Sequence, residues 1–167
     1  RDAIRDEYES MKNKQVWELH DKSVLPAQKK TIKMRWVFKV KNNNRHRARL
    51  VAQGFSQIPG IDYFESHSPV MSEVTFRTLL LLSLQKKWDI VTIDIEKAFL
   101  EANLDEDIYI EPPPGLDLVE DINTTNKICK LNKAVYGLVQ ASKAFYREII
   151  THLKNENLFL SHPSNPV

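Results

Sequence analysis

Cysteine, long apolar runs and a strong excess of one charge are scarce or missing in this chain of 167 residues. Its single cysteine, Cys129, excludes an internal disulfide and fits a reducing, intracellular setting. The longest apolar run, residues 79–82, is far too short to span a membrane, so no membrane partner is expected. Because the formal net charge is only +2, overall charge does not indicate a nucleic-acid partner, and the positions of the charges must decide.

The rest of the composition is that of a folded domain with a sizeable core. Hydrophobic residues make up 42% and charged residues 28%, as in ordinary globular proteins. The chain starts with Arg1 and stops in a loop-like stretch, residues 161–167, so we expect it to be a piece of a longer protein.

Hydrophobic periodicity and turn residues predict an α+β order of helix, hairpin, helix, three strands and helix. Helices are expected at 1–12, from the N-cap Ser72 to about 87, and from 141 to about 156. Strands are expected at 17–19, in a hairpin at 31–52, and at 88–95, 107–111 and 127–131, with a loop at 54–71. We expect the strand 88–95 and the leucine run 79–82 to be buried.

The predicted hairpin carries basic side chains on one face. Apolar and basic residues alternate on either side of the turn 42–44, and period two places alternate side chains on opposite faces. In matching register, one face carries seven cations: Lys33, Arg35, Lys39, Lys41, Arg45, Arg47 and Arg49. Such a face suits phosphates, because Arg and Lys supply most contacts to nucleotide and nucleic-acid backbones. The alternative is a solvated edge strand that uses cations against aggregation.

Asp94 is a carboxylate among mostly apolar, β-branched neighbours, residues 91–95. Burying a carboxylate is costly unless it is paired or bound to a metal, and Mg²⁺ takes carboxylates together with substrate phosphates. A phosphoryl-transfer site is one interpretation. The other is a wet strand face, because the alternation places Thr92, Asp94 and Glu96 on the same side.

A short segment, residues 136–140, precedes the last predicted helix. Gly137 gives it a permissive backbone position, and Gln140 lies near the helix start, where side chains and amides can meet an anion. From this segment alone, an ordinary strand-to-helix turn is the favoured interpretation.

Three separated segments together resemble one family. They read RWVFK at 35–39 with RARLVAQGF at 47–55, DIEKAFL at 94–100 with IYIEPP at 108–113, and LNKAVYGLVQA at 131–141. In this order and spacing they resemble the reverse transcriptase domain of copia-type LTR retrotransposons (Pseudoviridae), from about residue 17 to about residue 158.

The resemblance implies an α+β right-hand polymerase fold with an antiparallel sheet packed on helices. It implies one incomplete domain over residues 1–167, with fingers at about 17–88 and a partial palm at about 89–160. The C-terminal palm strands, the thumb and RNase H are expected to be absent. The implied activity is RNA-directed DNA polymerisation with Mg²⁺, two ions in the complete enzyme. The implied partners are an RNA or DNA template with its primer, a dNTP and the remainder of the Pol polyprotein, in a cytoplasmic virus-like particle.

The resemblance also implies roles for individual residues. Asp94 matches the first of three metal-binding aspartates and is the implied catalytic residue. Phe99 matches the bulky position under the nucleotide sugar that disfavours a 2′-hydroxyl. The other implied nucleotide-binding residues are Lys41, Arg47 and Arg49 at the fingertips, and Gln140, which contacts the nucleotide and positions the template pair.

The chain departs from the family pattern in two ways. The family carries a Tyr-x-Asp-Asp motif downstream of the last helix, and no adjacent pair of aspartates occurs here, so we expect this chain alone to be unable to polymerise. In addition, Val139 stands where the family commonly has Lys, and Phe145 where it commonly has Trp. The alternatives are a non-catalytic nucleic-acid-binding remnant of a degenerate element, and a structural or interaction domain with no nucleic-acid role.

Overall fold

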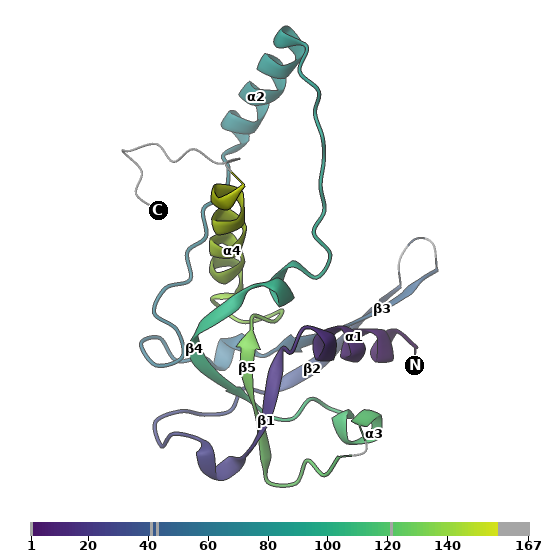
Figure 1. Ribbon diagram of the computed structural model, residues 1–167, viewed down its shortest axis with the longest axis vertical. Helices are drawn as coiled ribbons and strands as arrows, with labels where there is room; N and C mark the ends of the chain where they lie inside the picture. Colours follow the sequence, from purple (N-terminus) through teal and green to yellow (C-terminus); the bar gives the residue numbers. More distant parts are fainter. Residues whose placement is uncertain (1, 41, 43, 121, 157–167) are drawn as a thin grey trace.

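Two antiparallel sheets surrounded by helices make up the computed structural model, which describes residues 2–40, 42, 44–120 and 122–156 (Figure 1). The three-stranded sheet has the order β1-β5-β4, with β1 at Trp17–Asp21, β4 at Asn103–Ile110 and β5 at Lys127–Lys133. The second sheet is a hairpin of β2 (Met34–Val40) and β3 (His46–Ala52). The predicted α+β class and the predicted hairpin are therefore confirmed.

Three of the four helices in the described part of the chain lie where periodicity predicts them, and the short α3 has no counterpart in the prediction. The helices are α1 (Asp2–Asn13), α2 (Glu73–Lys86), α3 (Leu116–Glu120) and α4 (Ala141–Asn155), with single 3₁₀ turns at η1 (Lys22–Val24), η2 (Gly54–Ser56) and η3 (Ala98–Glu101). The predicted N-cap of α2 is confirmed, because the Ser72 hydroxyl accepts a hydrogen bond from the Thr75 backbone N–H at 3.1 Å. Among the described residues, every helix is too short or too polar to cross a membrane.

The core lies where α1, the hairpin and the three-stranded sheet meet. Ile32, just before β2, bridges the two sheets: its N–H donates to Tyr109 at 2.9 Å and its carbonyl accepts from Glu111 at 3.0 Å. Fully buried apolar side chains from all three parts fill the space between them, including Met11, Leu50, Leu100, Ile110 and Cys129. Cys129 is a small core residue, and burial raises the pKa of its thiol to about 12.

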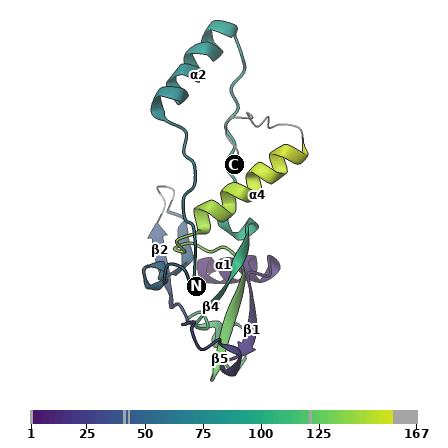
Figure 2. The ribbon, with the colours of Figure 1, turned by 90° about the vertical axis from the view of Figure 1, so that its left-hand side faces the viewer.

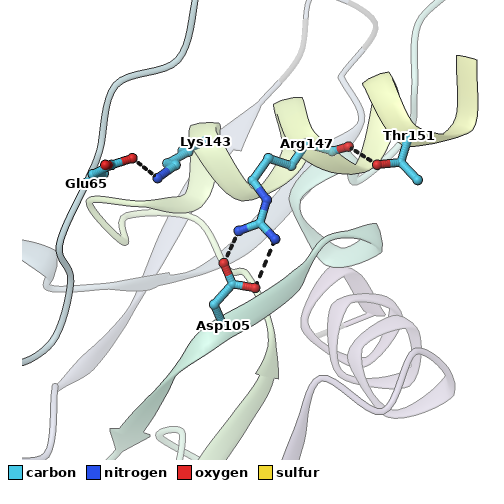
Figure 3. Close-up of polar contacts among 5 residues, drawn as sticks. All are labelled: Glu65, Asp105, Lys143, Arg147 and Thr151. Atoms are coloured by element: carbon cyan, nitrogen blue, oxygen red, sulfur yellow. Dashed lines mark hydrogen bonds and ion pairs between the residues drawn. The ribbon is translucent and has the colours of Figure 1, made fainter. Parts of the chain in front are cut away.

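Ion pairs attach α4 to two other parts of the chain (Figure 3). Lys143 pairs with Glu65 of the loop after η2, and its hydrogen bond lowers the pKa of the Glu65 carboxyl. One turn later Arg147 makes a two-pronged contact with Asp105 of β4, with one N···O distance of 3.1 Å. The start of α4, and the turn before it, are thus fixed against the sheet.

One region contradicts the sequence prediction. Residues 88–95 are extended but form no strand, and their apolar side chains are exposed, with Val91 at 80% and Ile93 at 81%. The leucine run of α2 is exposed as well, not buried in the core, with Leu81 at 68%. We call α2 together with residues 88–95 the apolar arm. Both views show α2 lying beyond the two sheets, so no described element covers it (Figures 1 and 2).

The apolar arm is expected to make the isolated chain self-associate at micromolar concentration, because its exposed apolar side chains favour burial against a second copy. In sedimentation velocity, Leu84→Glu should shift the population toward monomer, since Leu84 is 74% exposed. The neighbouring exposed Gln85→Glu adds the same charge without removing apolar surface and should leave the association unchanged. A wild-type chain that stays monomeric would contradict the prediction.

Candidate functional site

The hairpin register places basic side chains together on one face, as the alternation predicts. Lys39 pairs with Arg47 and Val37 with Arg49, whereas Phe38 pairs with Ala48. Because cross-strand partners point to the same side, Arg47 and Arg49 share a face with Lys39 and with Val37, which interrupts the row of cations, whereas Phe38 and Ala48 lie on the other face. The apolar face packs toward α1 through an edge-to-face contact of Trp36 with Tyr8, with ring centroids 5.2 Å apart. Lys41 lies outside the described residues.

A pocket of about 410 Å³ lies between this hairpin, α1 and the segment at the end of the apolar arm and just after it. Residues 45–49 of the hairpin line it, and so do residues 94–99. The remaining lining comes from α1 and from the turn before α4, through Ala3, Asp6, Glu7 and Tyr136. Three of the predicted site residues, Arg47, Arg49 and Phe99, therefore share a cavity with Asp94.

Arg49 lies against an aromatic row at this pocket. Its guanidinium stands over the Tyr136 ring, 4.8 Å from the centroid. Tyr136 in turn meets Phe99 edge-to-face at 5.1 Å, and Phe99 meets Phe145 of α4 at 6.3 Å. The Nε of Arg49 is buried and has no hydrogen-bond partner within the described part of the chain. A cationic donor held this way is prepared to bind an anion.

Close backbone contact explains why Tyr136 reaches Arg49. The Ala52 N–H at the end of β3 donates to the Tyr136 carbonyl at 2.7 Å. A Cβ at Gly54 would lie 2.0 Å from the Gly137 oxygen, and one at Gly137, where φ is +92°, would lie 2.1 Å from the Ala52 oxygen. Only glycines permit this approach, so they join the hairpin to the turn before α4.

Asp94 is exposed at the pocket, with neither an ion pair nor a hydrogen bond to any other described residue. Because Asp94 is not buried, burial of its carboxylate gives no argument for a metal role. Its position in the same pocket as the hairpin cations is the observation that favours such a role. In the described ranges, no three His, Cys, Asp or Glu side chains are grouped so as to hold a metal ion. Mg²⁺ commonly takes one or two carboxylates together with substrate phosphates. The residues present thus fit one protein ligand of a shared Mg²⁺ site.

Gln140 lies elsewhere. It is 2% exposed and is not among the residues that line the pocket. Its Oε1 accepts from Gln57 Nε2 at 2.9 Å, and its Nε2 donates to the Asp62 carbonyl at 3.1 Å. Gln57 also accepts from the Val139 N–H at 2.8 Å. These bonds satisfy a buried amide and fix the turn that carries Tyr136.

Tyr136 and Glu7 are among the pocket residues that sequence reasoning missed. Tyr136 stands in the segment already singled out, and the following Gly137 is the signal for a tight turn that presents it. Glu7 lies among several acidic residues in a charged helix, and nothing in the sequence separates it from its solvated neighbours.

Comparison with known proteins supports a single family. Residues 14–164 match the family described as reverse transcriptase (RNA-dependent DNA polymerase). The chain is 37% identical to the retrovirus-related Pol polyprotein from transposon RE1 of Arabidopsis thaliana, over 92% of this chain and 10% of that protein. It is 35% identical to the corresponding polyprotein from transposon TNT 1-94 of Nicotiana tabacum, over 98% of this chain and 12% of that protein.

The chain therefore spans about a tenth of the length of the curated relatives it matches. No solved structure is significantly similar to it. The match extends over nearly all of the described sheets and helices, from β1 to α4, and it includes each segment that carries the resemblance to copia-type elements. On this evidence the chain belongs to the reverse transcriptase (RNA-dependent DNA polymerase) family, and its relatives are retrotransposon Pol polyproteins.

Proposed function

We propose that this chain supplies the fingers, at about residues 17–88, and the first part of the palm, at about 89–160, of an RNA-directed DNA polymerase within a longer Pol polyprotein. The supporting observation is that the cations of β3 and Asp94 line one pocket. The missing palm strands, thumb and RNase H belong to the remainder of that polyprotein. The proposed setting is the cytoplasm, in a virus-like particle.

Cations of the hairpin bind the incoming nucleotide. Arg47 and Arg49, together with Lys41, hold the triphosphate of a dNTP and the template backbone. Arg suits this role because its planar fork makes bidentate contacts to phosphate. The Tyr136 ring holds the Arg49 guanidinium in place before the nucleotide arrives, so less side-chain freedom is lost on binding.

Asp94 holds one side of the reaction centre. It is the residue of this chain that would bind Mg²⁺, with the remaining ligands supplied by the nucleotide phosphates and by the rest of the polymerase. A metal bound there would supply positive charge that favours loss of the primer 3′-hydroxyl proton and offsets the charge on the leaving pyrophosphate. The oxygen of that hydroxyl forms a bond to the α-phosphorus, its proton passes to solvent, and the bond from the α-phosphorus to pyrophosphate breaks. The described residues contribute positioning and charge.

Two further residues determine how the nucleotide lies. Phe99 is proposed to lie under the sugar, where its ring excludes a 2′-hydroxyl. Gln140 remains a proposed nucleotide residue, but a direct contact would break its bonds to Gln57 and Asp62. We therefore assign its contribution mainly to the turn that presents Tyr136.

Charge reversal on β3 tests the proposal. In a polymerase that contains this chain, Arg47→Glu with Arg49→Glu should weaken binding of a primer–template duplex by about 10-fold or more at moderate salt. It should also lower the salt slope by about 0.9 for each phosphate that the hairpin no longer neutralises. Fluorescence anisotropy across a salt series measures both quantities.

A matched control reverses two cations remote from the pocket. Lys22→Glu with Lys30→Glu makes the same change of charge at exposed positions and should alter affinity far less. Equal effects of the two double variants, or no effect of either, would support a structural domain with no specific nucleic-acid role. Duplex binding without any extension by the complete protein would support the non-catalytic remnant.

A further inference from the structure

Helix α1 precedes residues 14–164, which match the family description, although the alignment with the TNT 1-94 polyprotein covers 98% of the chain, and it lines the pocket. Ala3, Asp6 and Glu7 lie on the same side of the cavity, and α1 packs against β3 (Figure 1). The family match therefore gives no role to this part of the site.

Glu7 is the unusual residue of this helix. Its side chain is 6% exposed, whereas a glutamate in a charged helix normally stays in water. Its Oε2 pairs with Lys97 Nζ at 3.1 Å, and its Oε1 has no hydrogen-bond partner among residues that the structure describes. A buried carboxylate is tolerated only when an opposite charge compensates it, so Lys97 is required where it stands.

Lys97 occupies the turn between the two predicted site residues. It has a left-handed backbone conformation, with φ of 53° and ψ of 38°, which is unfavourable for a residue with a Cβ. Its carbonyl accepts from the Leu100 N–H at 2.8 Å and begins η3, which carries Phe99. Its ammonium also donates to the Asp6 carbonyl of α1 at 3.4 Å. Contacts from α1 therefore hold Lys97 in this conformation.

We propose that Glu7 is a positioning residue: through Lys97 it fixes the turn that places Asp94 and Phe99 at the pocket, so that α1 is a working part of the polymerase site. The inference rests on the proposed function. Glu7 and Lys97 touch neither nucleotide nor metal in this scheme. They set the distance from Asp94 and Phe99 to the cations of β3.

Neutralising either partner tests the proposal in a polymerase that contains this chain. Glu7→Gln keeps the shape of the side chain and removes its charge, and Lys97→Met keeps the length of the lysine stem. Each should lower kcat/KM for dNTP by about 10- to 100-fold, as expected when reacting groups are displaced by up to about an ångström. Each should also lower the discrimination between dNTP and rNTP, because Phe99 moves with the turn.

Two results separate positioning from stability alone. On a dideoxy-terminated primer, where no turnover occurs, dNTP affinity in the ternary complex should fall in both variants while duplex affinity stays unchanged. The double variant should be no worse than the worse single one, because both remove the same ion pair. A different outcome would overturn the inference: the melting temperature falls, but the discrimination between dNTP and rNTP and the dNTP affinity of the ternary complex keep their wild-type values. The ion pair would then have only a structural role.

The ion pair of Lys12 with Glu120 is a matched control, because it also starts from α1 and also measures 3.1 Å but is remote from the pocket. Glu120→Gln should leave the discrimination between dNTP and rNTP unchanged. An effect as large as that of Glu7→Gln would overturn the assignment to Glu7.

Asp94→Asn separates this inference from the proposed function on which it rests. If the Glu7 variant keeps wild-type kinetics while Asp94→Asn is inactive, the positioning role of Glu7 is wrong and the proposed function stands. If Asp94→Asn extends the primer as well as the wild type does, the proposed function itself is wrong.

Discussion

Asp94→Asn is expected to abolish Mg²⁺-dependent primer extension by a polymerase that contains this chain, with a loss of about 10³-fold or more. The substitution keeps the size of the side chain and removes the negative charge that would bind the metal. Stabilisation of transition-state charge by a metal is worth several kcal/mol, and about 1.4 kcal/mol corresponds to a tenfold change in rate. Steady-state extension of a labelled primer at several Mg²⁺ concentrations measures the effect.

The loss should occur without unfolding. Asp94 is exposed, and neither a hydrogen bond nor an ion pair joins it to the described residues, so its replacement leaves no buried group unsatisfied. Asp89→Asn is the matched control, because Asp89 is exposed in the same extended segment but does not line the pocket. It should retain extension. Retained extension by the Asp94 variant, with an unchanged Mg²⁺ dependence, would remove Asp94 from the metal site.

The hairpin shows what the sequence is able to predict. Alternation of apolar and basic residues on either side of an asparagine turn, interrupted at Val37, predicts both the strands and the face on which most side chains lie, because a strand has period two. The register of Lys39 with Arg47 confirms that prediction. The helix caps and the burial of Cys129 follow from equally local rules.

Segment 88–95 shows where local rules fail. Its β-branched residues favour an extended, buried strand, but the segment pairs with no other strand among the described residues. Burial requires a partner, and no described element covers Val91 or Ile93. A sequence pattern expresses the preference of a segment and does not show which surface is available to satisfy it.

Gln140 and Glu7 show a second limit of local rules, which concerns the partners that polar side chains find. Gln140 is predicted at the nucleotide because its motif matches, but Gln57, distant in sequence, engages its amide in the interior. Glu7 resembles its exposed acidic neighbours until packing brings Lys97 beside it. Both outcomes depend on pairings between distant segments, which no local period encodes.

Phe99→Val is expected to raise the efficiency of ribonucleotide incorporation relative to deoxyribonucleotide incorporation by about 10- to 100-fold, the range that a change in pocket shape usually produces. Phe99 is half-buried, with its ring held edge-on by Tyr136 and by Phe145. A side chain fixed on two sides is not free to rotate away from an added hydroxyl, so we expect it to exclude the hydroxyl by steric overlap. Valine removes most of the ring and leaves space beside the Tyr136 face.

The measurement is the ratio of kcat/KM for rNTP to that for dNTP in one enzyme preparation. Loss of the ring also costs stability, by about 1–3 kcal/mol for a half-buried aromatic, but a smaller active fraction lowers both constants equally and cancels in the ratio. Phe99→Tyr keeps the ring and should retain discrimination close to the wild-type value. If valine and tyrosine variants discriminate equally well, the ring is not the sugar gate, and selectivity must come from another residue of the pocket, of which Tyr136 is the nearest aromatic.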